Sequence, residues 1–326
     1  MSEWNEKKLD EELNELLHDL PAQDDLERRI SQSINRRIRR AVFRTLAGIL
    51  GVFLVALLII NPLMNLMFFN PYQMNKGSEQ KMLGVLRDYF ETTGPYREVL
   101  GLKVEKKGFS KYQLEMQIVD TTQPVNFGVT NVWGKVAFGK YRNITDKDFL
   151  TAQQMGRFSW EYESQEEILE QIRELPKSAK IYLAVSDFSV KSLEQLKNAG
   201  VTLEWLQIYQ PEVAFQGGLS MQLLGGFSED DIREQMTEDE LLDVYRANLN
   251  NMLEYEEVWS EFGLYDGEMS YPTNPVAVLK ETCENAEKLQ TIQTERYCVS
   301  GKRDEVLQFL EKNTLETVFV ENVRLW

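Results

Sequence analysis

The sequence is poor in the residue types that carry most catalytic and metal chemistry. It has one histidine, His18, and two cysteines, Cys283 and Cys298. A Ser–His or Cys–His pair needs a histidine beside its nucleophile, and a zinc site needs several Cys or His ligands. The topology that the apolar run and its flanking charges predict places the histidine and the cysteines on opposite sides of a membrane, which excludes both kinds of site. We therefore expect no enzyme, no metal and no other cofactor.

Complete catalytic motifs are also missing. The segment Ser78–Lys81 fits S-x-x-K, but the S-D-N and K-T-G motifs that would support it do not occur. Acidic neighbours such as Asp230 and Asp231 could serve a glycosidase, yet sequence neighbours do not face one another on a helix. We interpret the first match as chance and the acidic pairs as solvated charge.

A long run without charge is the most informative feature that is present. Leu46–Ile60, LAGILGVFLVALLII, contains eleven Leu, Ile, Val or Phe in fifteen residues, and the uncharged run continues to Phe69. A membrane span needs about 20 helical residues to cross a hydrocarbon core of about 30 Å. We predict a transmembrane helix over residues 46–69, with a kink at Pro62.

The charges on either side of this run predict its direction. Seven arginines precede it, and the first cations after it are Lys76, Lys81 and Arg87. Cations near a span are retained in the cytoplasm, so we place residues 1–45 inside the cell and residues 70–326 outside. A signal peptide is disfavoured because 45 residues precede the run and no small-residue cleavage site follows it. A buried helix of a soluble protein is the other alternative, although no other part of the chain is apolar enough to surround it.

The outer part is strongly acidic. Residues 70–326 hold 27 basic and 42 acidic residues, a surface that repels nucleic acid and anionic lipid and favours cationic ligands or simple solubility. Its length suffices for one large domain or two small ones. We expect a juxtamembrane helix and a β-rich region over 70–175, then an α+β region with a helical insertion over 176–326. No nucleic-acid partner is expected.

The segment 1–45 is predicted to form two helices. The first has a leucine stripe within about 100° of arc, made of Leu9, Leu13, Leu16, Leu17 and Leu20. Two helices of this size cannot form a core of their own, so the stripe either closes a helical hairpin or binds a partner protein in a groove. An anionic inner leaflet would repel this acidic helix, which favours the protein partner. The Arg-rich second helix is expected to run unbroken into the membrane and to lie against lipid headgroups.

Apolar periodicity predicts an α+β fold outside the membrane. A helical stripe over Glu79–Glu91 precedes a strand in which alternate residues are apolar from Tyr112 to Ile118, and a β pattern continues from Phe127 to Phe138. A short helix over Glu166–Leu175 should stop at Pro176. Further helices are predicted by a capping box at Thr237–Glu240 and by Pro275 in the favoured first position.

Two later segments share one pattern. Lys180–Ile208 and Arg296–Val323 each contain an apolar strand, an amphipathic helix of about ten residues and a second apolar strand. They flank the helical insertion. Two β–α–β units in one sheet indicate a layer related to ferredoxin-like folds.

Cys283 and Cys298 leave two alternatives open. Both are placed outside, where disulfides persist, and a bridge closing a loop of about 15 residues would contribute about 3 kcal/mol. Cys283 also lies at helical spacing from Leu279 and Ala286, which fits a small buried thiol equally well.

Five segments resemble the bacterial sigma factor regulator family. They are NPLMNLMFFNPY (Asn61–Tyr72), DYFETTGPYREVLG (Asp88–Gly101), GFSKYQLEMQIVD (Gly108–Asp120), KIYLAVSD (Lys180–Asp187) and RYCVSGKRDEVLQFL (Arg296–Leu310). In that family the N-terminal part contains the transmembrane helix and the C-terminal part lies outside the cell. The H-x-x-x-C-x-x-C pattern of zinc-type anti-sigma factors is absent.

The resemblance implies a membrane-bound anti-sigma factor in the bacterial cell envelope. Its cytoplasmic segment would hold an alternative sigma factor through the leucine stripe until an envelope signal relieves the inhibition. Because this segment is shorter than many sigma-binding domains, a second membrane protein is a further expected partner. The alternative is an extracytoplasmic binding or scaffolding protein, for which the N-terminus is only an anchor.

Overall fold

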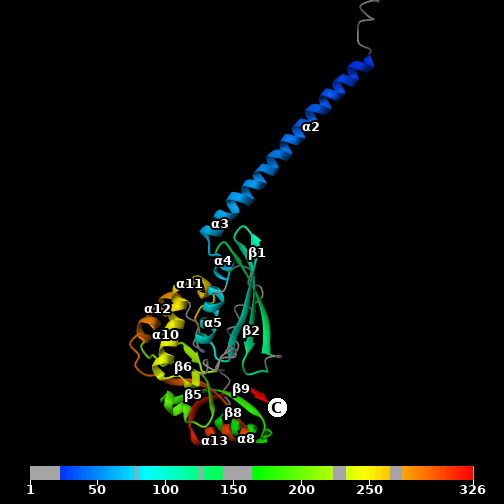
Figure 1. The fold of residues 1–326 in the computed structure, drawn as a ribbon. Helices are drawn as coiled ribbons and strands as arrows, with labels where there is room; N and C mark the ends of the chain where they lie inside the picture. Colours follow the sequence, from blue (N-terminus) through cyan, green and yellow to red (C-terminus); the bar gives the residue numbers. More distant parts are fainter. Residues whose placement is uncertain are drawn as a thin grey trace, which may run out of the picture. The chain divides into compact units, whose positions relative to one another are not determined.

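The computed structural model describes residues 23–77, 80–124, 128–141, 164–222, 233–264 and 274–325. They form an α+β structure with one long apolar N-terminal helix and two β-sheets (Figure 1). The chain divides into two compact units, Met1–Leu63 and Met64–Trp326. The leucine stripe from Leu9 to Leu20 lies outside the described residues.

The described part of the first unit is helical throughout. Helix α2 (Gln23–Val55) continues through a π-helical turn, η1 (Ala56–Ile60), into α3 (Asn61–Met67). The prediction that the Arg-rich segment runs unbroken into the apolar run is therefore confirmed. The π-turn precedes Pro62, whose ring would clash with a carbonyl one α-helical turn earlier. The Asn61 N–H instead bonds to the Ala56 carbonyl, five residues back, so the disturbance expected at Pro62 takes this form.

A four-stranded antiparallel sheet follows in the second unit. Its order is β1-β2-β3-β4, with bounds Arg97–Gly108, Lys111–Asp120, Val129–Ala137 and Lys140–Tyr141. The predicted alternation in β2 is confirmed, because Tyr112, Leu114, Met116 and Ile118 are all buried. Phe138 was expected in a strand, but it lies in a two-residue turn between β3 and β4 with a φ of 54°.

The two β–α–β units share one five-stranded sheet, as predicted. Its order is β7-β6-β8-β5-β9, with bounds Gly218–Ser220, Thr202–Gln207, Gln293–Lys302, Lys180–Ser192 and Leu315–Arg324. Strand β8 pairs antiparallel with both β5 and β6, and β5 pairs antiparallel with both β8 and β9. Each unit therefore has one strand of the other unit between its own two strands, which is the split β–α–β arrangement of ferredoxin-like layers.

The connecting helix of the first β–α–β unit is shorter than predicted. Helix α9 (Leu193–Lys197) has five residues instead of about ten, because β5 continues to Ser192 and pairs there with Gln293. Ser192 and Gln195 form a capping box that begins the helix at Leu193. The second unit has the predicted length, with ten residues in α13 (Arg303–Lys312).

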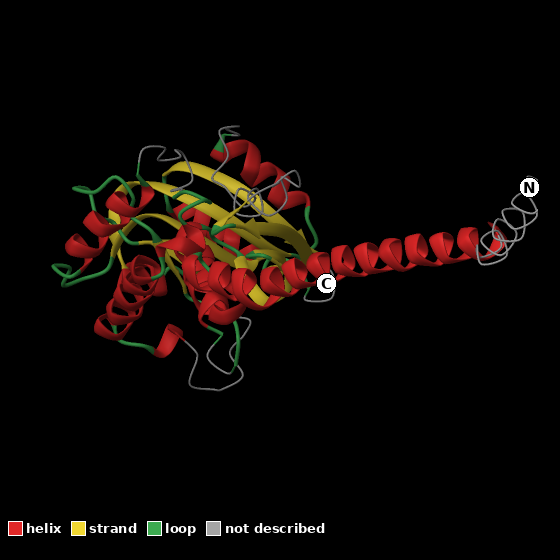
Figure 2. Cartoon of the chain, turned by 90° about the horizontal axis from the view of Figure 1, so that it is seen from above, coloured by secondary structure: helices red, strands yellow, loops and turns green. Residues whose placement is uncertain are grey.

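The remaining helices surround the strands (Figure 2), and the two sheets share one core of buried side chains. They are α4 (Pro71–Met74), α5 (Lys81–Thr93), α8 (Gln165–Glu174), η4 (Arg233–Gln235), α10 (Glu238–Glu254), α11 (Glu256–Trp259) and α12 (Pro275–Ala286). One cluster of buried side chains includes Leu86 of α5, Leu114 of β2, Leu183 of β5 and Leu249 of α10. The predicted capping box at Thr237–Glu240 and the helix start at Pro275 are both present.

The two cysteines are free, buried thiols in this structure. Cys283 lies on α12 in the main core, and Cys298 lies on β8 in a second cluster with Tyr96 and Trp205. Of the two alternatives, the structure has the buried thiols and no bridge between them. Burial raises the pKa of Cys283 to about 11 and that of Cys298 well above its usual value, so neither is a ready nucleophile at neutral pH.

Candidate functional site: the apolar helix and its attachment

The first unit exposes an unusually large apolar surface. The helical stretch Arg28–Met67 is long and apolar enough to cross a membrane, and none of the side chains in its apolar window is buried. Phe43, Val52 and Leu58 are each more than 70% exposed. A core helix of a soluble protein would be covered by other elements, and water is an unfavourable solvent for a surface of this size. The helix therefore fits a lipid environment by its length, composition and exposure.

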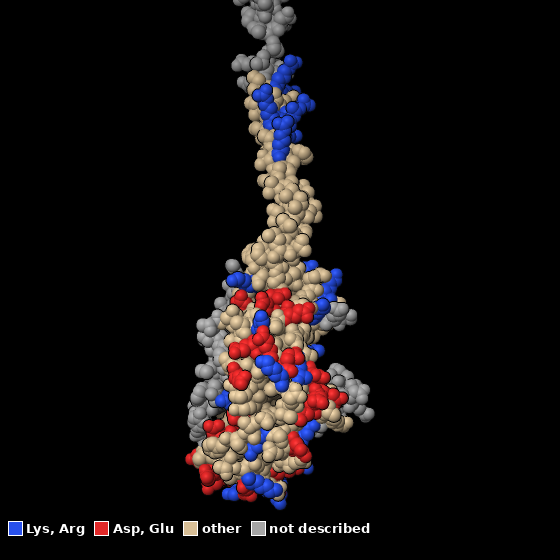
Figure 3. All heavy atoms as spheres, turned by 90° about the vertical axis from the view of Figure 1, so that its left-hand side faces the viewer, with Lys and Arg blue, Asp and Glu red and all other residues tan. Residues whose placement is uncertain are grey.

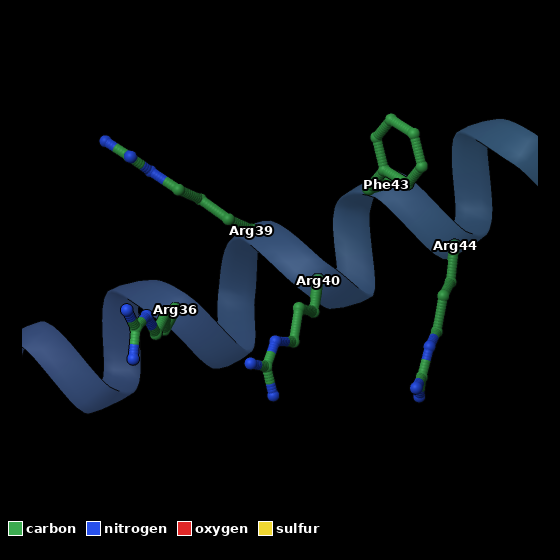
Figure 4. Close-up of a pocket in the computed structure, with 5 residues that line it drawn as sticks. All are labelled: Arg36, Arg39, Arg40, Phe43 and Arg44. Carbon is green, nitrogen blue, oxygen red and sulfur yellow. The ribbon is translucent and has the colours of Figure 1, made fainter.

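Arginines gather immediately before the apolar stretch (Figures 3 and 4). Arg36, Arg40 and Arg44 are spaced four residues apart and point to one side of α2, whereas Arg39 and Phe43 point away from them. No acidic residue occurs between Arg28 and Gly77. The sequence thus supplies no carboxylate partner for these guanidinium groups along this length of chain.

Residues from Met64 onward, including the last residues of α3, belong to the second unit. The Asn65 side-chain oxygen accepts hydrogen bonds from the Ser110 N–H at 3.1 Å and from the Tyr112 hydroxyl at 3.0 Å. The Asn70 side chain donates in turn to the Asn65 carbonyl at 3.2 Å. An asparagine inside an apolar run is therefore explained by contacts with residues about 45 positions away.

Aromatic and amide contacts continue this attachment through α4. Phe68 meets Phe138 edge to face, with ring centres 6.0 Å apart, and the Lys106 ammonium lies 3.9 Å from the centre of the Tyr72 ring. Asn75 donates to the Leu102 carbonyl at 3.0 Å. The chain from Met64 to Asn75 is thus packed onto the four-stranded sheet, and it does not act as an unstructured linker.

The described part of the second unit contains several carboxylates that are buried or nearly so. Glu91 of α5 forms an ion pair with Arg233 of η4, and both side chains are about 10% exposed. Burial raises the pKa of Asp88 to about 6. Burial and the neighbouring Asp120 raise the pKa of Glu321 to about 7, although Arg97 opposes the shift. Among the described residues, no three His, Cys, Asp or Glu side chains form a group that could hold a metal ion.

The raised pKa of Glu321 predicts that the stability of the protein depends on pH. Its pKa is higher in the folded protein than the ordinary value of 4.5, so folding favours the protonated form. The resulting stabilisation is complete at low pH and is lost as the pH rises through about 7. We expect the free energy of unfolding to fall by about 2 kcal/mol between pH 5 and pH 8 from this group. Urea unfolding at several pH values measures it.

The neutral variant Glu321→Gln should show a flatter pH profile than the wild type, with its largest gain at pH 8. Glu316→Gln on the same strand is the matched control, because Glu316 is exposed. Parallel profiles for the wild type and Glu321→Gln would contradict the assignment.

Comparisons with known proteins gave no match: no family model fits the sequence, and no curated protein or solved structure is similar to the chain. The resemblance to sigma factor regulators rests on the five quoted segments. Sequence reasoning found the apolar run and its arginines. It missed the contacts of Asn65 and the Glu91–Arg233 pair, because nothing local in the sequence specifies either.

Proposed function

We propose that this chain is a single-pass anti-sigma factor of the bacterial cell membrane. Residues 1–45 lie in the cytoplasm, where Leu9, Leu13, Leu16, Leu17 and Leu20 bind an alternative sigma factor. Residues 70–326 lie outside and respond to an envelope signal. Sequestration follows from mass action, since sigma factor held at the membrane is withdrawn from RNA polymerase. The protein acts by binding and carries no catalytic step.

The charge asymmetry of the first unit is the observation that carries the proposal. Seven arginines precede an apolar helix in which no residue of the apolar window is buried, and the chain after the helix enters a folded acidic unit. The positive-inside rule then orients the leucine stripe toward the cytosol. The packed segment Met64–Asn75 also supports a signalling role, because a change in the second unit would be passed directly to the end of the helix.

Cysteine labelling in intact cells tests the topology. A membrane-impermeant maleimide should label Lys312→Cys, at an exposed site of α13, and should leave Ser31→Cys unlabelled until the cells are broken. Cys283 and Cys298 are buried, so the unsubstituted chain should give little background. If Ser31→Cys alone were labelled in intact cells, the orientation would be the opposite of the one proposed, and the anti-sigma proposal would be wrong.

A pull-down tests the partner. Residues 1–45 immobilised on beads should enrich a sigma factor from cytosol, and the same peptide with Leu13→Asp should not. If the two peptides retain the same proteins, the leucine stripe has no specific partner.

A second candidate function places the binding role outside the cell. Trp133 of β3 is 42% exposed on the outward face of the four-stranded sheet. It lies opposite Glu115, and Gln117 and Asn131 form the neighbouring pair. An exposed tryptophan among polar side chains is typical of a binding surface. On this hypothesis, deletion of residues 2–25 leaves function intact, whereas the anti-sigma proposal requires its loss.

A further inference from the structure

Two hairpin tips meet beside the end of the apolar helix. The β1–β2 turn is Phe109–Ser110, and the β3–β4 turn is Phe138–Gly139. The Ser110 carbonyl accepts from the Phe138 N–H at 3.0 Å, and the Ser110 N–H donates to the Asn65 side chain at 3.1 Å. Asn65 thus bonds to the β1–β2 tip, which in turn bonds to the β3–β4 tip, where the chain enters the second unit.

The length of the span places this point at the membrane surface. About 20 helical residues cross the hydrocarbon core, and 20 residues counted from Leu46 end at Asn65, so residues 66–69 of the predicted span lie in the outer interface. The β1–β2 tip, which bonds to Asn65, and the β3–β4 tip, which contacts Phe68, then lie at the level of the outer headgroups. This step rests on the membrane insertion proposed above.

The tips are basic although the unit that carries them is acidic. Four exposed lysines, here called the tip lysines, surround the two turns: Lys106, Lys107, Lys111 and Lys140. The neighbouring acid is Glu105, which pairs with Lys103 and Lys107. Residues 70–326 carry a net negative charge, so anionic lipid would repel most of this surface. The positive charges of the tip lysines would instead attract anionic lipid, and they lie at the part of the second unit nearest the bilayer.

Phe109 occupies a backbone position that disfavours it. Both turns have positive φ at their two central residues, with 49° at Phe109 and 53° at Ser110. Such two-residue turns favour Asn and Gly, because a bulky side chain is strained there. Phe109 is nevertheless 36% exposed. A bulky aromatic side chain at such a backbone position is a reason to seek a function, and an aromatic ring at the headgroup level is favourable.

We propose that the β1–β2 hairpin tip is a second membrane contact, in which Phe109 enters the outer interface and the tip lysines bind the phosphates of anionic lipids. The second unit is then held on the bilayer at two places, the helix and the tip. This fixes its height and tilt above the membrane.

Fluorescent labels on the full chain in lipid nanodiscs test the contact. Single labels at Phe109→Cys, Val52→Cys and Lys312→Cys report the tip, the span and a distant surface. Iodide quenches from water, and nitroxide lipids quench from a chosen depth. The Phe109→Cys label should be shielded from iodide and quenched by headgroup nitroxide in discs that contain phosphatidylglycerol. Replacing Lys106, Lys107 and Lys111 with Gln should weaken the binding of the tip to the disc surface. The ratio of the tip's binding constants for phosphatidylglycerol and phosphatidylcholine should fall by roughly a hundredfold.

Lys177, Lys280 and Lys288, all exposed, give a control triple Lys→Gln variant with the same change of net charge. If this control lowers the preference as much as the tip variant, the tip is not the contact. If the label at 109 behaves like that at 312 while the label at 52 is quenched deep in the bilayer, the hairpin contact is refuted and the anchoring stands. If the label at 52 is itself open to iodide, the insertion fails, and the tip contact fails with it.

Discussion

Replacing Leu13 and Leu16 with aspartate should release the sigma factor and raise transcription of its regulon. Each substitution removes an apolar side chain from the stripe, which contributes about 2 kcal/mol when buried. It also places a carboxylate in an apolar groove, which costs several kcal/mol more. Because every 1.4 kcal/mol is a factor of ten in affinity, the double variant should bind at least about a thousandfold more weakly. A promoter fusion to the regulon measures the release.

The opposite face of the same predicted helix supplies the control. Glu12→Gln and Glu15→Gln change charge away from the leucine stripe and should leave the sigma factor bound. Both variants must reach the membrane in wild-type amount, which immunoblotting of membrane fractions establishes. Unchanged transcription in the Leu13→Asp/Leu16→Asp strain, at normal protein level, would rule out the stripe as the binding site.

Local signals in the sequence predicted much of the fold. The alternation from Tyr112 to Ile118 marks β2, and the Thr237–Glu240 capping box begins α10 at Glu238. These features predict their elements correctly because hydrophobic period and helix capping depend on a few consecutive residues. The short α9 could have been predicted in the same way, since Ser192 and Gln195 fit the capping box that begins it. The strand residues before Ser192 were wrongly assigned to the helix.

Turns without their usual residues could not be predicted. Phe109–Ser110 and Phe138–Gly139 form turns that Asn-Gly or Asp-Gly would normally signal. Tertiary contacts decide the conformation instead, since Phe138 packs on Phe68 and Ser110 bonds to Asn65.

Contacts between distant residues were equally invisible. Gly218 gives no local sign of a packing role, yet it is the first residue of β7 and lies against the Trp205 ring, leaving no room for a Cβ atom. The quoted segments also give no reason to pair Glu91 with Arg233, which are 142 positions apart. Sequence periodicity describes one element at a time, whereas these contacts depend on how several elements pack.

Truncating Glu91 should destabilise the second unit more than any surface change. Its carboxylate accepts hydrogen bonds from Arg233, from the Asn248 side chain at 3.2 Å and from the Ser220 N–H at 3.1 Å. Glu91→Ala leaves the guanidinium of Arg233 buried without its carboxylate partner, while its hydrogen bond to the Ser220 carbonyl, at 2.8 Å, remains. Breaking a buried ion pair in this way costs about 3–5 kcal/mol, which is a large fraction of the 5–15 kcal/mol typical of a folded protein. Urea unfolding of the full chain in detergent, followed by tryptophan fluorescence, measures the loss.

An exposed pair gives the reference for this measurement. Arg173 and Glu311 are 2.9 Å apart, and both side chains are more than half exposed. Solvent screens such a pair, so Glu311→Ala should barely move the unfolding midpoint. Equal midpoints for Glu91→Ala and Glu311→Ala would mean that water reaches Glu91 and that the pair is not buried in solution.

The double variant Glu91→Leu/Arg233→Met separates the charge from the hydrogen bonds. If the cost in Glu91→Ala comes from an uncompensated buried charge, removing both charges should recover much of the lost stability. Asn248 and the Ser220 N–H would still lack their acceptor, and each unsatisfied group costs about 1–3 kcal/mol. If the unfolding free energy of the double variant lies within that range of the wild-type value, the loss in Glu91→Ala is due to the charge on Arg233. Failure to recover would assign it to the hydrogen bonds by which Glu91 joins α5 to β7 and α10.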